Sequence, residues 1–183
     1  MEKFIQEPRY IPVDFDPFGP NEILQTIPTT EAQQEVMLAA GMSKEASCAY
    51  IESVSLELKG TLEHAAILKA VDQLVQRHGS LRSTLSATGT RMMIWAHQPV
   101  TIPVVDLSGH SPEARSKALA ALSEKDMTTE FDLINGPLFR AQLIRLGANE
   151  HHLRLTAHHA VCDGWSLGIM MAEISSLYTA NLT

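Results

Sequence analysis

The ten residues Ala157-His158-His159-Ala160-Val161-Cys162-Asp163-Gly164-Trp165-Ser166 lie near the C-terminal end of this 183-residue chain. They are typical of the end of a strand, a short polar loop and the start of a helix. Two adjacent histidines, an acid four residues after the second one and then a glycine place several chemically active groups at one junction. We therefore predict that the functional site lies here.

The two histidines are predicted to face opposite ways, because side chains alternate along a strand. In an extended segment 150–159, His159 ends an apolar row and His158 ends a polar one. The apolar row contains Leu153, Leu155 and Ala157, and the polar row contains His152, Arg154 and Thr156. Partial desolvation at the end of an apolar row favours a neutral imidazole near pH 7, so His159 is the candidate general base. His158 is expected to hold the loop by hydrogen bonds.

Two alternative roles are considered for each of the next two motif residues, Asp163 and Gly164. Asp163 could orient an imidazole or, if buried, would need a cationic partner. Gly164 permits backbone angles that are closed to other residues, and it also permits the close approach of a ligand. Its backbone N–H is therefore either an oxyanion donor or simply part of the turn.

The rest of the chain alternates between helix and strand patterns. Thr30 and Gln33 form a capping box that opens a helix to about residue 41. Further helices are predicted over 61–78, 111–128 and 165–180, and strands over 49–59, 81–87, 91–96, 102–105, 138–146 and 151–158. Strands joined by hairpins together with long helices indicate an α+β fold in layers.

The N-terminal segment is different in character. Residues 1–28 contain five prolines and no apolar periodicity, which predicts a linker that lies along a surface. One folded domain is then expected over 29–183, a length sufficient for a real core.

Composition excludes several classes of partner. A formal net charge of -7 without a basic run argues against nucleic acid and against an anionic membrane. No stretch approaches the roughly 20 apolar residues of a membrane-spanning helix, and residues 1–4 do not open a secretory signal. The two cysteines lack metal-ligand spacing, so a cytoplasmic location is expected.

Three rival interpretations concern the same region. Cys162 could be a nucleophile paired with His159, although a buried small side chain is the simpler explanation. Zinc could bind the histidines 151, 152, 158 and 159. His152 and His158, however, lie six residues apart on one face, too far to share an ion at about 3.3 Å per residue. Tyr178 on the last helix is expected in the core.

The junction resembles the HHxxxDG motif of the condensation domains of nonribosomal peptide synthetases, which are relatives of chloramphenicol acetyltransferase. Two upstream segments agree with this resemblance, in order along the chain. Residues 30–33, TEAQ, resemble the Ser-x-Ala-Gln segment of the family, and residues 77–85, RHGSLRSTL, resemble its Arg-His-Glu-x-Leu-Arg-Thr-x-Phe segment. Met37, Gly79 and Leu85 depart from the family pattern at packing or edge positions.

The resemblance implies a fold and a chemistry. The fold is the N-terminal lobe of a chloramphenicol acetyltransferase-like domain, a mixed β-sheet packed with helices, whose active site lies between this lobe and a second one. The reaction joins a donor acyl thioester to an acceptor amine, both carried on the 4'-phosphopantetheine of carrier proteins, with no cofactor bound directly and no metal. His159 matches the base or positioning histidine of the family, and Asp163 matches an aspartate that pairs with an arginine, for which Arg82 is the candidate.

The resemblance also implies partners and leaves alternatives. Donor and acceptor carrier proteins are expected, together with a C-terminal lobe and an adenylation domain in the same chain, so the isolated lobe should be inactive. The segment 47–53, SCAYIES, resembles condensation domains that follow polyketide modules and suggests an acyl or polyketide donor. The alternatives are a non-catalytic docking lobe, an epimerisation domain and a free-standing acyltransferase.

Overall fold

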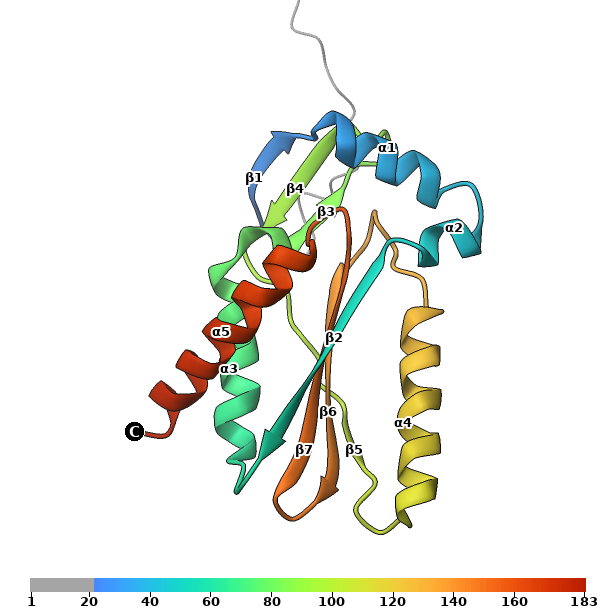
Figure 1. Ribbon diagram of the computed structural model, residues 1–183. Helices are drawn as coiled ribbons and strands as arrows, with labels where there is room; N and C mark the ends of the chain where they lie inside the picture. The colour runs from blue at the N-terminus through green and yellow to red at the C-terminus, as the bar shows by residue number, and fades with distance from the viewer. Residues whose placement is uncertain (1–21) are drawn as a thin grey trace, which may run out of the picture.

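The computed structural model describes residues 22–183 and consists of two sheets with helices packed around them (Figure 1). The strands are β1 (Ile23–Pro28), β2 (Ile51–Lys59), β3 (Ser83–Leu85), β4 (Arg91–Trp95), β5 (Val104–Asp106), β6 (Phe139–Gly147) and β7 (Glu150–His158). The helices are α1 (Glu31–Ala40), α2 (Lys44–Cys48), α3 (His64–Arg77), α4 (Pro112–Met127) and α5 (Gly164–Asn181), with a 3-10 turn η1 (Gly79–Arg82). None of the described helices is long and apolar enough to cross a membrane.

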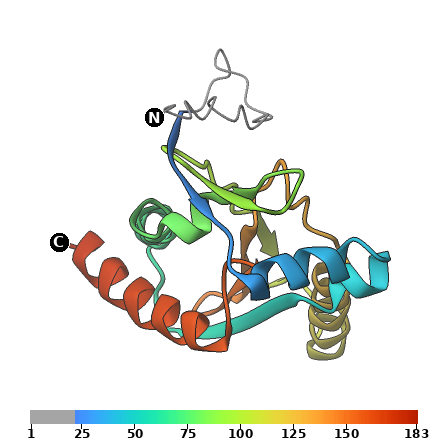
Figure 2. The ribbon, with the colours of Figure 1, turned by 90° about the horizontal axis from the view of Figure 1, so that it is seen from above.

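The larger sheet has four strands in the order β2-β7-β6-β5 and carries the functional junction at the end of its central strand β7. Its first three strands are antiparallel neighbours, and β5 runs parallel to β6. Helices α3 and α5 cover one face and α4 covers the other (Figures 1 and 2). The α+β class and the mixed sheet packed with helices are therefore confirmed.

The main core lies between this sheet and the pair α3 and α5. Leu153 and Leu155 of β7 are almost fully buried there, as the alternation along the strand predicts. They pack against apolar residues of both helices: Ile67, Val71, Leu74, Leu167, Met170 and Ile174. Burial of each leucine side chain stabilises the fold by about 1.5–3 kcal/mol. This burial fixes which row of β7 side chains faces α3 and α5 and which faces α4.

The smaller sheet has three strands in the order β1-β4-β3 and corrects the predicted linker boundary. Ile23–Pro28 was expected in the linker but forms the edge strand β1, antiparallel to β4. Pro28 ends the strand, where a missing N–H is tolerated, and Ile27 packs on a small core with Leu85 and Met92. The expected linker over 1–21 lies outside the described residues.

Local chemistry explains most of the remaining boundaries. The predicted Thr30 and Gln33 capping box of α1 is present. Ser111 caps α4 at the start of the helix predicted over 111–128. Helix α3 begins three residues later than predicted, and the Glu63 N–H at its start donates to the Tyr178 hydroxyl at 3.1 Å. The short helix α2, capped by Ser43, was not predicted because five residues are too few to show a period.

Candidate functional site

His159 is the first residue after β7, and its side chain is 40% exposed. Its backbone N–H donates to the Tyr50 carbonyl at 2.8 Å, which continues the pairing with β2 for one more step. Its Nδ1 lies 3.0 Å from the Cys162 carbonyl oxygen. The imidazole is thus held at the end of β7 by the loop that follows it.

This contact decides the tautomer of a neutral His159 ring. A carbonyl oxygen can only accept, so the proton must sit on Nδ1. The Nε2 lone pair is then available to accept a proton or a hydrogen bond from a ligand. That is the arrangement a general base or an orienting group requires.

Glu52 is a neighbour of His159 that the sequence did not single out. Its Oε1 lies 3.7 Å from the His159 Nδ1, and both side chains are 40% exposed. Glu52 interrupts the otherwise apolar row of β2 made by Val54, Leu56 and Leu58, and that break in the pattern was the available signal. Glu52 therefore places a carboxylate beside the ring, on the same side as the Cys162 carbonyl.

His158 lies on the opposite face and is fully buried. Its Nδ1 accepts from the Ala160 N–H at 3.2 Å. The Phe131 and Tyr50 rings lie next to it, with centroids 6.1 and 6.2 Å away. Burial, together with the neighbouring His159, lowers the pKa of His158 to about 4. A neutral ring that holds the turn fits the expected structural role.

The lowered pKa of His158 predicts how stability depends on pH. The unfolded chain takes up this proton below about pH 6.5, whereas the folded chain does so only near 4. Acid therefore favours unfolding, by up to about 1.4 kcal/mol per pH unit between these values. Urea unfolding at pH 7, 6 and 5 should show a steeper loss for wild type than for His158→Asn, whose amide oxygen can replace Nδ1 as acceptor. Parallel curves for the two proteins would contradict this.

Asp163 is the N-cap of α5 and is exposed. Its Oδ1 accepts from the Ser166 N–H at 2.8 Å and from the Ser166 hydroxyl at 2.6 Å. These hydrogen bonds hold the pKa of Asp163 below its usual range. Asp163 thus fixes where α5 begins and therefore where the loop after His159 ends.

The expected ion pair between Arg82 and Asp163 is wrong for this structure. Arg82 is buried and donates to backbone carbonyls of Val75 at 3.1 Å, of Ala96 at 3.0 Å and of Trp95. Neither residue belongs to an ion pair with the other among residues 22–183. Arg82 links α3 to β4 through hydrogen bonds to their backbone carbonyls. Asp163 instead accepts a hydrogen bond from a backbone N–H in the first turn of α5.

Gly164 is the first residue of α5, and its φ is not positive. The turn therefore does not require glycine, which removes one of its two predicted roles. A Cβ built on Gly164 would meet no atom within 4 Å. Open space above the backbone is what the close approach of a ligand would need.

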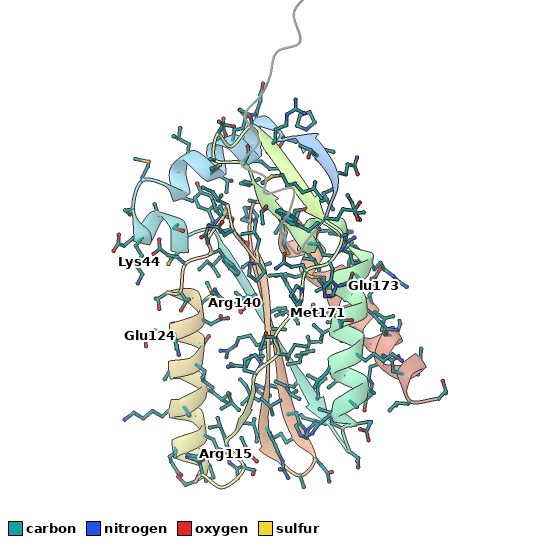
Figure 3. The ribbon with its side chains drawn as sticks, turned by 180° about the vertical axis from the view of Figure 1, so that it is seen from behind. Lys44, Arg115, Glu124, Arg140, Met171 and Glu173 are labelled. Carbon is teal, nitrogen blue, oxygen red and sulfur yellow. The ribbon has the colours of Figure 1, made fainter. Side chains whose placement is uncertain are left out.

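The two upstream segments support the junction directly. The Gln33 side chain of α1 donates to the Ala160 carbonyl at 2.9 Å, inside the loop. Arg77 and His78 at the end of α3 lie 3.4 and 2.7 Å from the Glu173 carboxylate. Figure 3 labels Glu173 on α5. Segments that are distant in sequence thus converge on the strand–loop–helix unit that carries His159.

The structure bears on the three rival interpretations, which concern Cys162, a zinc site and Tyr178. Burial raises the pKa of the Cys162 thiol to about 12, so it stays protonated near neutral pH and is a poor nucleophile. No group of three or more potential metal ligands occurs within residues 22–183. Tyr178 packs against the main core and also accepts the Glu63 N–H.

The family model described as "Condensation domain" matches residues 23–183. Chondramide synthase of Chondromyces crocatus is 35% identical over 156 residues, covering 84% of this chain and 4% of that protein. Malpibaldin synthetase of Mortierella alpina is 37% identical over 150 residues, covering 81% of this chain and 3% of that protein. The chain thus spans a few per cent of the length of these relatives.

Solved structures agree on the fold. The starter condensation domain of rhizomide synthetase superposes with a TM-score of 0.74 at 24% identity, over 85% of this chain and 39% of that one. The first condensation domain of the CDA synthetase superposes with a TM-score of 0.74 at 25% identity, over 87% of this chain and 40% of that one. The chain therefore has the fold of about two fifths of such a domain.

Proposed function

This chain belongs to the condensation domain family of nonribosomal peptide synthetases, and from that premise we propose that it is the N-terminal lobe of a domain that forms amide bonds. The amine of a carrier-bound aminoacyl group attacks the donor thioester carbonyl of a second carrier. A C–N bond forms, the C–S bond breaks, and the donor thiol leaves with a proton. The finer proposal of an acyl or polyketide donor rests only on the resemblance of segment 47–53.

The observation that carries this proposal is the orientation of His159. Its Nδ1–H is committed to the Cys162 carbonyl, which leaves Nε2 free to orient the amine or to receive its proton. The Glu52 carboxylate lies 3.7 Å from the same Nδ1 and so also faces away from Nε2. Positioning and proton transfer thus come from one side chain whose tautomer the loop sets.

The second lobe is part of the proposal. Trp165 is 82% exposed and Ile169 is 45% exposed, both on α5 just after the motif. Large apolar side chains that stay exposed next to a functional group are typical of surfaces that another folded unit covers. We propose that the C-terminal lobe packs here and encloses His159, with carrier proteins delivering the two pantetheine arms from outside.

The test is transfer between loaded carrier proteins. We expect the 183-residue chain to be folded by circular dichroism but inactive on an aminoacyl acceptor and an acyl donor. The same chain joined to a C-terminal lobe of the family should form the amide. Product from the isolated chain at the rate of the two-lobed protein would contradict the proposal, and so would an inactive two-lobed protein that binds both carriers.

Gly164 gives a second prediction. Since its φ is not positive and its Cβ position is open, Gly164→Ala should raise the free energy of unfolding of this chain by about 0.4–1 kcal/mol. In the two-lobed protein the added methyl group should obstruct the ligand, so transfer should fall although stability does not. Gly168→Ala on the same helix, also with open space at Cβ, is the matched control. Unchanged transfer by Gly164→Ala would exclude the close-approach role.

A further inference from the structure

The sheet face under α4 is polar along its central strand. Antiparallel register places Arg154 between Ser55 of β2 and Gln142 of β6. One step along, Thr156 lies between Ser53 and Arg140. The opposite face of the same strand holds the leucine core, so this polarity is confined to the side that α4 covers.

Arg154 is the unusual member of this face. It is 6% exposed, and its Nη1 is buried without a hydrogen-bond partner. No ion pair joins Arg154 to any residue in the described part of the chain. Arginine cannot relieve this by losing its proton, so an uncompensated buried guanidinium is strongly unfavourable.

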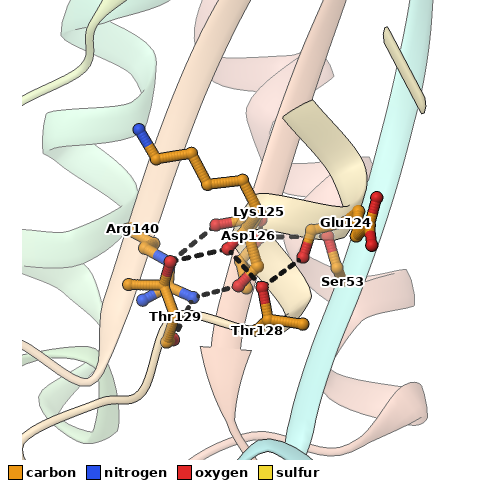
Figure 4. Close-up of polar contacts among 8 residues, drawn as sticks. Ser53, Glu124, Lys125, Asp126, Thr128, Thr129 and Arg140 are labelled. Atoms are coloured by element: carbon orange, nitrogen blue, oxygen red, sulfur yellow. Dashed lines mark hydrogen bonds and ion pairs between the residues drawn. The ribbon is translucent and has the colours of Figure 1, made fainter. Parts of the chain in front are cut away.

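The nearby acids are already engaged. Asp126 at the end of α4 accepts from the Arg140 Nε at 2.7 Å (Figure 4). It also accepts from the Thr156 hydroxyl. Glu57, on the diagonal position of β2, lies 3.6 Å from the Lys59 ammonium and is largely exposed. Neither carboxylate is committed to Arg154.

A cavity of about 390 Å³ lies beside Arg154, between α4 and the sheet. Its charged lining is three cations and one carboxylate, namely Lys125, Arg140, Arg154 and Asp126. Pro103 and Leu122 add apolar walls. The volume is within the range of small-molecule sites, and the excess of positive charge selects an anion.

We propose that this cavity binds a small organic carboxylate, with Arg154 as its anchor. A guanidinium presents two parallel N–H donors that match the two oxygens of a carboxylate. The Pro103 and Leu122 walls suit an apolar body attached to that carboxylate, which distinguishes the ligand from inorganic phosphate. The site lies on the face of β7 opposite the leucine core and does not depend on the amide-forming reaction.

The binding test uses this chain and hexanoate, with inorganic phosphate as the second probe. Calorimetry should show hexanoate binding to wild type, at least tenfold weaker binding to Arg154→Gln, and little change for Arg145→Gln. The Arg145 variant removes the same charge from β6 at a position paired with exposed Asp106. Hexanoate binding that is absent, or equal in wild type and Arg154→Gln, would overturn the proposal. Phosphate binding as tight as hexanoate would overturn the ligand class.

A stability measurement separates a binding residue from a structural one. Without ligand, Arg154→Met should raise Tm, because it replaces an unpaired buried charge with an apolar side chain of similar length. With saturating hexanoate, the Tm of wild type should rise and that of the variant should not. A lower Tm for ligand-free Arg154→Met would mean that Arg154 stabilises the fold itself and would contradict the proposal. Circular dichroism of each variant checks that it is folded.

Discussion

Replacing His159 by alanine is expected to lower amide transfer by about 10²–10⁴-fold in the two-lobed protein, the range usual for loss of a general acid or base. The melting temperature should change little, because the ring is 40% exposed and makes one hydrogen bond, to the Cys162 carbonyl. Single-turnover transfer between loaded carriers measures the loss, and carrier binding should stay the same.

Two further variants make this result specific. His152→Ala removes another histidine of β7 that lies on the α4 side, and it should leave transfer unchanged. His159→Gln retains a polar side chain without a titratable nitrogen, so partial recovery would assign the main effect to positioning. Transfer by His159→Ala at near wild-type rate would remove His159 from the reaction.

Arg82→Ala is expected to lower the free energy of unfolding by at least about 3 kcal/mol, since hydrogen bonds to charged groups contribute about 1.5–3 kcal/mol each. The change leaves the Val75, Trp95 and Ala96 carbonyls without their donor. Arg82→Lys should recover little, because an ammonium lacks the planar fork that reaches several carbonyls at once. Urea unfolding of this chain measures both.

The same experiment tests the corrected role of Asp163. Asp163→Ala removes the N-cap of α5 and should lower the free energy of unfolding by about 1 kcal/mol. Because Arg82 and Asp163 share no partner, the double variant should lose the sum of the two effects to within about 0.5 kcal/mol. A coupling energy well above that value would show that the two side chains do pair in solution.

The sequence predicts the elements better than their pairings. Leu153, Leu155 and Ala157 alternate with polar residues, and the structure buries them as that alternation requires. The capping box at Thr30 likewise acts locally, so its three-residue spacing sufficed. Strand β1 was missed because it is held by pairing with β4, more than 60 residues away in the chain. Its own six residues show only weak alternation and end in a proline.

In the candidate site, too, features set by local sequence were predicted and a contact between distant residues was not. His158 and His159 occupy opposite faces because adjacent residues of a strand must do so, and the sequence was sufficient for that. The partner of Asp163 was predicted wrongly because a motif match does not say which distant arginine comes near. The Asp163-x-x-Ser166 spacing before a helix was the local signal for an N-cap.

The most direct measurement is a structure of the two-lobed protein with an aminoacyl-pantetheine amide in the acceptor position. We expect the amine nitrogen within about 3 Å of His159 Nε2 while Nδ1 keeps its contact with the Cys162 carbonyl. An imidazole sealed by the second lobe with no opening beside it, or an amine held by other groups out of hydrogen-bond reach, would contradict the account.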